Sequence, residues 1–164
     1  MVEVQGITNT INELDGLYNT HPEQAAYFSK LALLELCGWI EQSMDKIILD
    51  CSNAKLGNAQ NKKHVEDIIV DKTYGFHYKE HFRLMLMKVI GLVLLEQIET
   101  RIEANGDLGI LASQLGSLKV NRDKVAHTTI TGITFSYEAP SKMKQYLKRI
   151  SDILIRFDNE LQAI

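Results

Sequence analysis

Hydrophobic residues recur at intervals of three and four positions along most of the chain, a spacing that gathers side chains on one face of an α-helix. The first such stripe runs from Val4 to Tyr18 and ends in the polar stretch 19–21. Pro22 suits the first turn of a second, longer helix that reaches about Cys51. Because the apolar positions of this second helix approach heptad spacing, we expect it to lie at the centre of the fold.

The helical pattern resumes after a loop over residues 52–60 that contains Asn, Gly and Ser. A short amphipathic helix is predicted around 65–69, and a long helix over roughly 76–104. An Asn-Gly-Asp sequence ends that long helix, and leucines spaced by three and four then predict a further helix from residue 108.

The pattern changes after residue 127. Apolar and polar residues alternate over 133–137, after a Thr-Gly pair that suits a turn, and this predicts a short extended or hairpin insertion. Pro140 then begins a last amphipathic helix. The sequence therefore predicts an all-α fold, an antiparallel bundle of four long helices plus a short helix and this insertion, in a single domain spanning 1–164.

Composition and charge narrow the possible functions. The chain has 164 residues, of which 45% are hydrophobic and 24% charged, which is ordinary for a globular protein and unlike a disordered or fibrous one. With 18 basic and 21 acidic residues the formal charge is −3, which argues against a broad basic surface for binding duplex nucleic acid. A small local basic site is compatible with this total.

Nothing in the sequence predicts secretion or a membrane segment. The first residues have neither a basic region nor a long apolar run. The most apolar stretch, 84–95, is interrupted by Lys88 and is shorter than the ~20 residues needed to cross a bilayer. Cys37 and Cys51 are isolated, which favours buried, reduced thiols. We therefore expect a cytoplasmic protein that does not bind a membrane.

Two polar features have both a functional and an ordinary interpretation. His77, Glu80 and His81 have H-x-x-E-H spacing, in which two histidines share a helix face and can bind zinc. Because the motif is short and lacks an evident third ligand, we predict no metal site and assign the histidines to a polar first helical turn. Glu41 follows an apolar run, and either faces inward with a partner or reaches water at the edge of its helix.

Arg122 is a more specific candidate. If the helix that begins near 108 continues, Arg122 occupies an inward position in a row that leucines otherwise fill. If Asn121 instead caps a new helix, Arg122 is its first residue and the positive helix end adds to its charge. Because a guanidinium keeps its proton, both interpretations predict an anion near Arg122. Residues 119–149 include seven basic and two acidic side chains, a local excess of +5.

The sequence Arg122-Asp-Lys-Val-Ala-His127, within a chain of long helices, resembles the R-x(4–6)-H motif of the HEPN superfamily. The resemblance covers the chain from about Tyr27 onward and is nearest to HEPN nucleases of bacterial defence and toxin–antitoxin loci. It implies a metal-independent RNA endonuclease that needs no cofactor and forms its active site at a homodimer interface. An antitoxin protein is a possible partner of that class, although the Tyr-x-Tyr sequence of some family toxins is absent here, where Tyr137 stands alone.

The resemblance also assigns roles to the two motif residues. RNA carries its own nucleophile, the 2′-hydroxyl, so the chemistry needs no metal-bound water. His127 would act as general base or acid because imidazole titrates near working pH. Arg122 would stabilise the additional negative charge on the phosphorus in the transition state. A second copy of the motif would allow one histidine to accept a proton while the other donates one.

Supporting residues are predicted around this pair. Asp123 would orient the arginine or the RNA, Glu41 would anchor the arginine, and Asn121 is a further supporting residue, which caps a helix in the second of the two interpretations above. Lys119 and Lys124 would bind substrate phosphates. Two alternatives stay open: a non-catalytic HEPN-like module that binds a nucleotide, an RNA or a protein, and a helical scaffold with Arg122 in a structural ion pair.

Overall fold

The computed structural model describes residues 1–126 and 137–164, and within these ranges the chain is all-helical with no β-strand. These ranges contain six α-helices, which are α1 (Gln5–Thr20), α2 (Ala25–Lys55), α3 (Ala59–His64), α4 (Arg83–Glu103), α5 (Asp107–Ala126) and α6 (Pro140–Gln162). Shorter turns are the 3₁₀ turn η1 (Pro22–Gln24) and the π-helical turns η2 (Val65–Val70) and η3 (Tyr78–Phe82).

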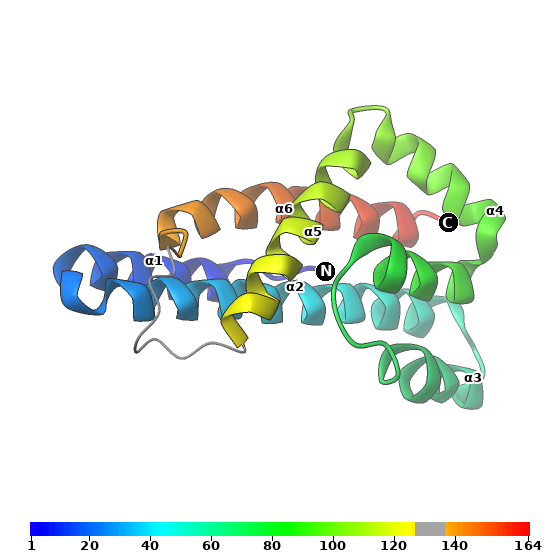
Figure 1. The fold of residues 1–164 in the computed structure, drawn as a ribbon. Coiled ribbons are helices and arrows are strands. Elements are labelled where there is room, and N and C mark those ends of the chain that lie inside the picture. Colours follow the sequence, from blue (N-terminus) through cyan, green and yellow to red (C-terminus); the bar gives the residue numbers. More distant parts are fainter. Residues whose placement is uncertain (127–136) are drawn as a thin grey trace.

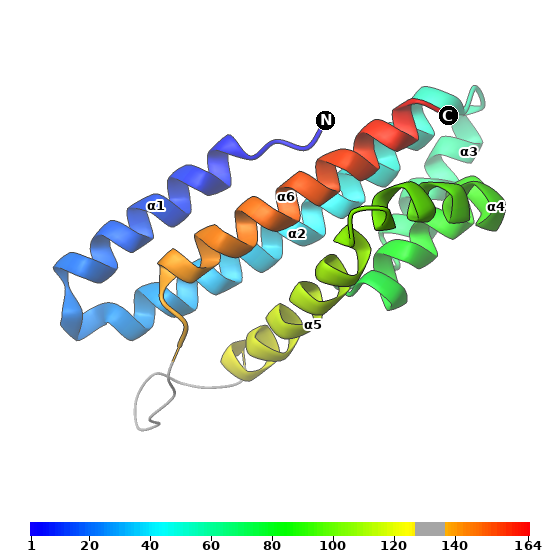
Figure 2. The ribbon, with the colours of Figure 1, turned by 90° about the horizontal axis from the view of Figure 1, so that it is seen from above.

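Helices α1, α2 and α6 run alongside one another and all three are in mutual contact (Figure 1). Helix α5 crosses this unit at a steep angle in the view of Figure 1 and packs against α2 and α6, on the side away from α1 (Figure 2). Helices α3 and α4 cover the end of the bundle where the chain terminates (Figure 1). Helix α2 touches each of the other long helices, so the prediction that it lies at the centre is confirmed.

One hydrophobic core joins α1, α2, α4, α5 and α6, whereas α3 has no buried residue. Helix α2 contributes its apolar stripe, in which Leu36, Ile40, Met44 and Ile48 are fully buried. Burial of an aliphatic side chain of this size stabilises a fold by ~1.5–3 kcal/mol. The three- and four-residue spacing read in the sequence is therefore the direct cause of the central position of α2.

Three predictions about the fold either need correction or concern residues that the structure does not describe. Within the described ranges five helices, rather than four, have 16 residues or more. The helix predicted over 76–104 begins with the π-helical turn η3, continues directly into α4 at Arg83, and bends at Gly91, where φ is 77° and ψ is 162°. The predicted insertion falls on residues 127–136, outside the described residues, except for Tyr137, which precedes α6 and is not in a strand. Among the described helices, none is both long enough and apolar enough to traverse a bilayer.

Buried charge fixes the start of α5. Asp107, the first residue of this helix, is 2% exposed. Its carboxylate accepts a 2.8 Å hydrogen bond from Arg149 and a second bond from Arg156, both on α6. Glu103 accepts hydrogen bonds from the backbone N–H groups of Leu108 and Gly109, which have no partner within the helix. Because α5 is anchored here, its residues about four turns later have a defined position against α2.

Candidate functional site

Arg122 lies on α5 between α2 and the segment that precedes η3, with 31% of its side chain exposed. Its guanidinium carbon is 5.3 Å from the centre of the Phe76 ring, a cation–π distance. Its Nη2 and Nε donate hydrogen bonds of 3.1 and 3.3 Å to Asp123. The Nη1 atom is 4.0 Å from a carboxylate oxygen of Glu41. The structure thus brings Arg122, Asp123 and Glu41 together, and the anion expected beside Arg122 is a pair of carboxylates.

Glu41 connects this arginine to a tight turn. While one of its oxygens faces Arg122, the other accepts a 2.5 Å hydrogen bond from the backbone N–H of Gly75. Gly75 has φ of +115°, which L-residues with a side chain rarely adopt. A Cβ at this position would lie 3.1 Å from a ring carbon of His81. The turn therefore requires glycine, and it places the next residue, Phe76, against the arginine.

His81 belongs to the same turn. Its Nδ1 accepts a 3.1 Å hydrogen bond from the backbone N–H of His77, which requires the neutral tautomer with the proton on Nε2. The Nδ1 of His77 is buried, has no hydrogen-bond partner among the described residues, and is 4.0 Å from Glu80. The two histidines of the H-x-x-E-H sequence thus make different contacts, His81 with the backbone of the turn and His77 with Glu80. Within residues 1–126 and 137–164, no group of three His, Cys, Asp or Glu side chains is arranged to hold a metal.

Lys119 completes the charged group around Arg122. Its ammonium is 2.9 Å from the second oxygen of Asp123, one helical turn along α5. Hydrogen bonds from Lys119 and then Arg122 lower the pKa of Asp123, so that this carboxylate stays ionised. Two cations therefore face two carboxylates, Asp123 and Glu41. This balance holds the guanidinium in place, and an incoming phosphate would have to displace carboxylate contacts to bind it.

Sequence patterns did not single out two further residues near Arg122. Phe76 falls at the start of a predicted core helix, and no sequence signal places its ring beneath the arginine. Asp45 lies four residues after Glu41 on α2, in a pocket of about 610 Å³ that Asp71 also lines. Burial, and then the charges of Glu41 and Asp71, raise the pKa of Asp45 to about 6. Two acidic residues at this helical spacing repel one another, and that signal was available in the sequence.

The thiol of Cys37 is influenced by this charged group. Burial raises the pKa of the thiol to about 12, although the charge of Arg122 acts in the opposite direction. A thiol with such a pKa stays protonated at neutral pH and is a poor nucleophile. The arrangement therefore assigns Cys37 to the core.

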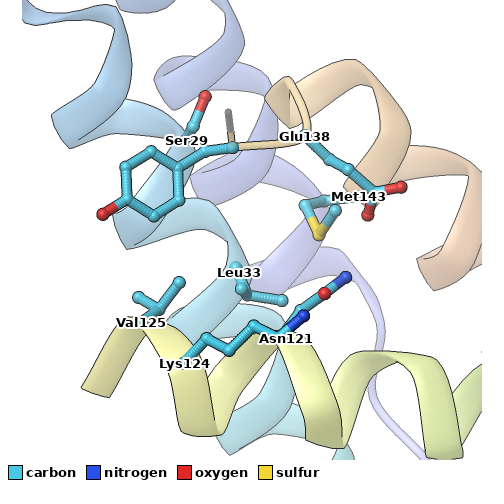
Figure 3. A pocket seen from close by; sticks show the side chains of 8 residues that line it. Ser29, Leu33, Asn121, Lys124, Val125, Glu138 and Met143 are labelled. Carbon is cyan, nitrogen blue, oxygen red and sulfur yellow. The ribbon is translucent and has the colours of Figure 1, made fainter. Parts of the chain in front are cut away.

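The other residues predicted for the site are not part of the charged group around Arg122. Helix α5 continues unbroken to Ala126, so the alternative in which Asn121 caps a new helix is wrong. Asn121 and Lys124 instead line a small pocket on another face of α5 (Figure 3). His127 lies outside the described residues.

Comparisons with known proteins add no family to this geometry. No protein-family model matches the chain, and neither a curated protein nor a solved structure matches it. The HEPN resemblance therefore rests on the Arg122–His127 motif and the helical architecture.

Proposed function

We propose that the protein is a metal-independent RNA endonuclease of the HEPN type, acting as a homodimer in toxin or antiviral-defence function. The observation that carries this proposal is the fixed, partly exposed guanidinium of Arg122. It is held against Phe76 by Asp123 and by Glu41, which is itself tied to Gly75. An arginine oriented before substrate arrives stabilises transition-state charge without reorganisation at the moment of reaction.

The proposed reaction uses groups of the RNA and of the motif. His127 of one copy removes the proton from a 2′-hydroxyl, and the oxygen attacks the adjacent phosphorus. Arg122 donates hydrogen bonds to the phosphoryl oxygens as their negative charge grows. The second His127 donates a proton to the departing 5′-oxygen, which leaves a 2′,3′-cyclic phosphate and a 5′-hydroxyl. One proton is taken and one is returned, so the step is balanced.

The flank of α5 next to Arg122 supports assembly with a second copy. Lys119, Asp123 and Gly116 follow one another around this flank, at ~60°, ~100° and ~120° from Arg122 on a helix of 3.6 residues per turn. Among the described residues, no atom outside the adjoining helix backbone lies within 4 Å of the position that a Cβ on Gly116 would occupy. A second chain could therefore approach this flank closely and bring its own Arg122 near the first.

An RNA-cleavage assay in EDTA tests the activity. We expect wild-type protein to cleave single-stranded or structured RNA, and Arg122→Ala and His127→Ala to lower the rate by at least ~100-fold. Arg101→Ala is the matched control, because Arg101 lies on α4 in an ion pair with Glu160 and should leave the rate unchanged. Loss of wild-type activity in EDTA, or full activity in both motif variants, would overturn the proposal.

Assembly has its own test. Gly116→Arg should shift the protein from dimer to monomer in analytical ultracentrifugation, because the long side chain would occupy the flank, and its Cβ lies in open space in the monomer. Gln97→Arg, at an exposed position of α4, is the control and should stay dimeric. A dimer of Gly116→Arg with full activity would contradict the proposed interface.

A second candidate function is a non-catalytic module that binds a nucleotide, an RNA or a protein. Its supporting observation is that Asp123 and Glu41 already supply Arg122 with negative partners. In that case RNA binding would occur without cleavage and would not change in His127→Ala.

A further inference from the structure

A small pocket opens beside Arg122, on the neighbouring face of α5. Asn121 and Val125 lie ~100° and ~60° from Arg122 around the helix, both on the same side. They line this pocket together with residues of α2 and of the start of α6, as Figure 3 shows. A strand whose phosphate contacts Arg122 can therefore turn a nearby base toward this face of the same helix.

The floor of the pocket is apolar and its size is restrictive. Leu33, Val125 and Met143 are all buried and provide the floor. The pocket volume is about 120 Å³. An apolar cavity of about 150 Å³ accommodates one benzene ring. The pocket thus suits a single six-membered ring with one edge toward solvent, and excludes most of a fused double ring.

The rim of the pocket supplies hydrogen-bonding groups of opposite kinds. Glu138 offers carboxylate oxygens, which only accept when ionised, whereas the Asn121 amide both donates and accepts. Within the described part of the chain, neither side chain is tied to another residue by a hydrogen bond. The phenol ring of Tyr137 also lines the pocket, and aromatic rings stack on unpaired bases.

We infer that this pocket binds the base of a cytidine in single-stranded RNA, next to the phosphate held by Arg122. Cytosine is a single ring whose exocyclic amino group donates to a carboxylate such as Glu138. Its ring nitrogen and carbonyl oxygen accept from a donor such as the Asn121 amide. Uracil has the same size, but presents a carbonyl oxygen where cytosine has the amino group, and would meet the Glu138 carboxylate with like polarity. The inference deepens the proposed function, on which it rests for its RNA ligand.

Two oligonucleotides of equal length test this preference. One is a short oligouridine, and the other is the same strand with one central cytidine, each labelled with a fluorophore. Binding is measured by anisotropy with the full-length His127→Ala variant, so that cleavage does not consume the probe. We expect the cytidine strand to bind roughly tenfold more tightly, the size of one good base-specific hydrogen-bonding pair. A central adenosine should give no such gain because its double ring exceeds the pocket.

Glu138→Gln supplies the sharper variant, because glutamine keeps the size of the side chain and adds an amide group that can donate to the uracil oxygen. The expected result is loss of the cytidine preference with oligouridine affinity retained or raised. Glu13→Gln, on the exposed side of α1, is the control and should keep the preference. Competition by cytidine monophosphate but not uridine monophosphate would show that the base itself, rather than strand shape, is recognised.

The outcomes separate this inference from the proposed nuclease. A cytidine preference that Glu138→Gln removes supports the inference, even if wild-type protein cuts no RNA and the nuclease proposal fails. If the protein cleaves RNA in EDTA but binds cytidine and uridine strands equally, the inference is overturned and the nuclease proposal stands. Absence of binding to every strand overturns the inference, and overturns the nuclease proposal as well if the wild-type protein cleaves no RNA in EDTA.

Discussion

Replacing Gly75 by alanine perturbs the turn on which Arg122 depends. The backbone has φ of +115° at this residue, and an added Cβ would lie 3.1 Å from the His81 ring. A residue with a side chain in so sparsely populated a region costs ~1–3 kcal/mol. We therefore expect Gly75→Ala to lower the free energy of unfolding by about 2 kcal/mol, measured by urea denaturation. For a chain of this size each kcal/mol lowers the melting temperature by ~2–4 °C.

The same substitution should also reduce RNA cleavage or binding in the folded protein. Gly75 donates its N–H to Glu41 and precedes Phe76, so a displaced turn loosens both contacts of Arg122. Gly38→Ala is the matched control, because Gly38 lies within α2 and needs no unusual φ, and no described atom outside the adjoining helix backbone lies within 4 Å of an added Cβ. There alanine should stabilise the helix by ~0.5–1 kcal/mol. Equal effects of the two substitutions would refute the reasoning about the turn.

Three further predictions concern stability and reactivity. Asp107→Asn weakens two ion pairs to half-exposed arginines and should lower the free energy of unfolding by ~1–3 kcal/mol in urea, whereas an unchanged value would contradict the anchoring of α5. The raised pKa of Asp45 means that the folded state favours its protonated form, so stability is lost as pH rises from about 4 to about 6. Asp45→Asn should flatten this pH dependence and raise the free energy of unfolding by about 1 kcal/mol at pH 7, a value reduced for solvent screening. An unaltered pH profile would contradict this prediction. The thiol of Cys37, with its pKa raised to about 12, should resist iodoacetamide at pH 7.5 until the protein is unfolded, and rapid native labelling would show that it is accessible and ionised.

The apolar spacing of the sequence was sufficient to predict the helices, because burial of one helical face is a local and periodic requirement. It placed α2 at the centre correctly, since the apolar stripe of that helix extends over most of its 31 residues. The bend at Gly91 was not predicted, because a glycine inside an apolar helical pattern is compatible with a straight helix. After this bend Val93 is 73% exposed, although the apolar periodicity of the predicted helix places it on the core face.

The site was only partly predictable for a different reason. That Arg122 would need an anion follows from the chemistry of its guanidinium, and Asp123 and Glu41 were both among the residues named. The contact with Phe76 depends on the Gly75 turn, which joins parts of the chain about 45 residues apart and leaves no periodic signal. The sequence left open whether Asn121 caps a new helix or lies within a continuous one, and packing of Val125 into the core keeps α5 helical there.

The most direct test of the proposed chemistry is to identify the ends of RNA cut by the wild-type protein in EDTA, by mass spectrometry. Attack by the 2′-hydroxyl predicts 2′,3′-cyclic phosphate and 5′-hydroxyl ends, and no cut at a position where the 2′-oxygen carries a methyl group. The same products should be absent with Arg122→Ala and present with Arg101→Ala. Products with 3′-hydroxyl and 5′-phosphate ends, or no cleavage by the wild-type protein, would contradict the account.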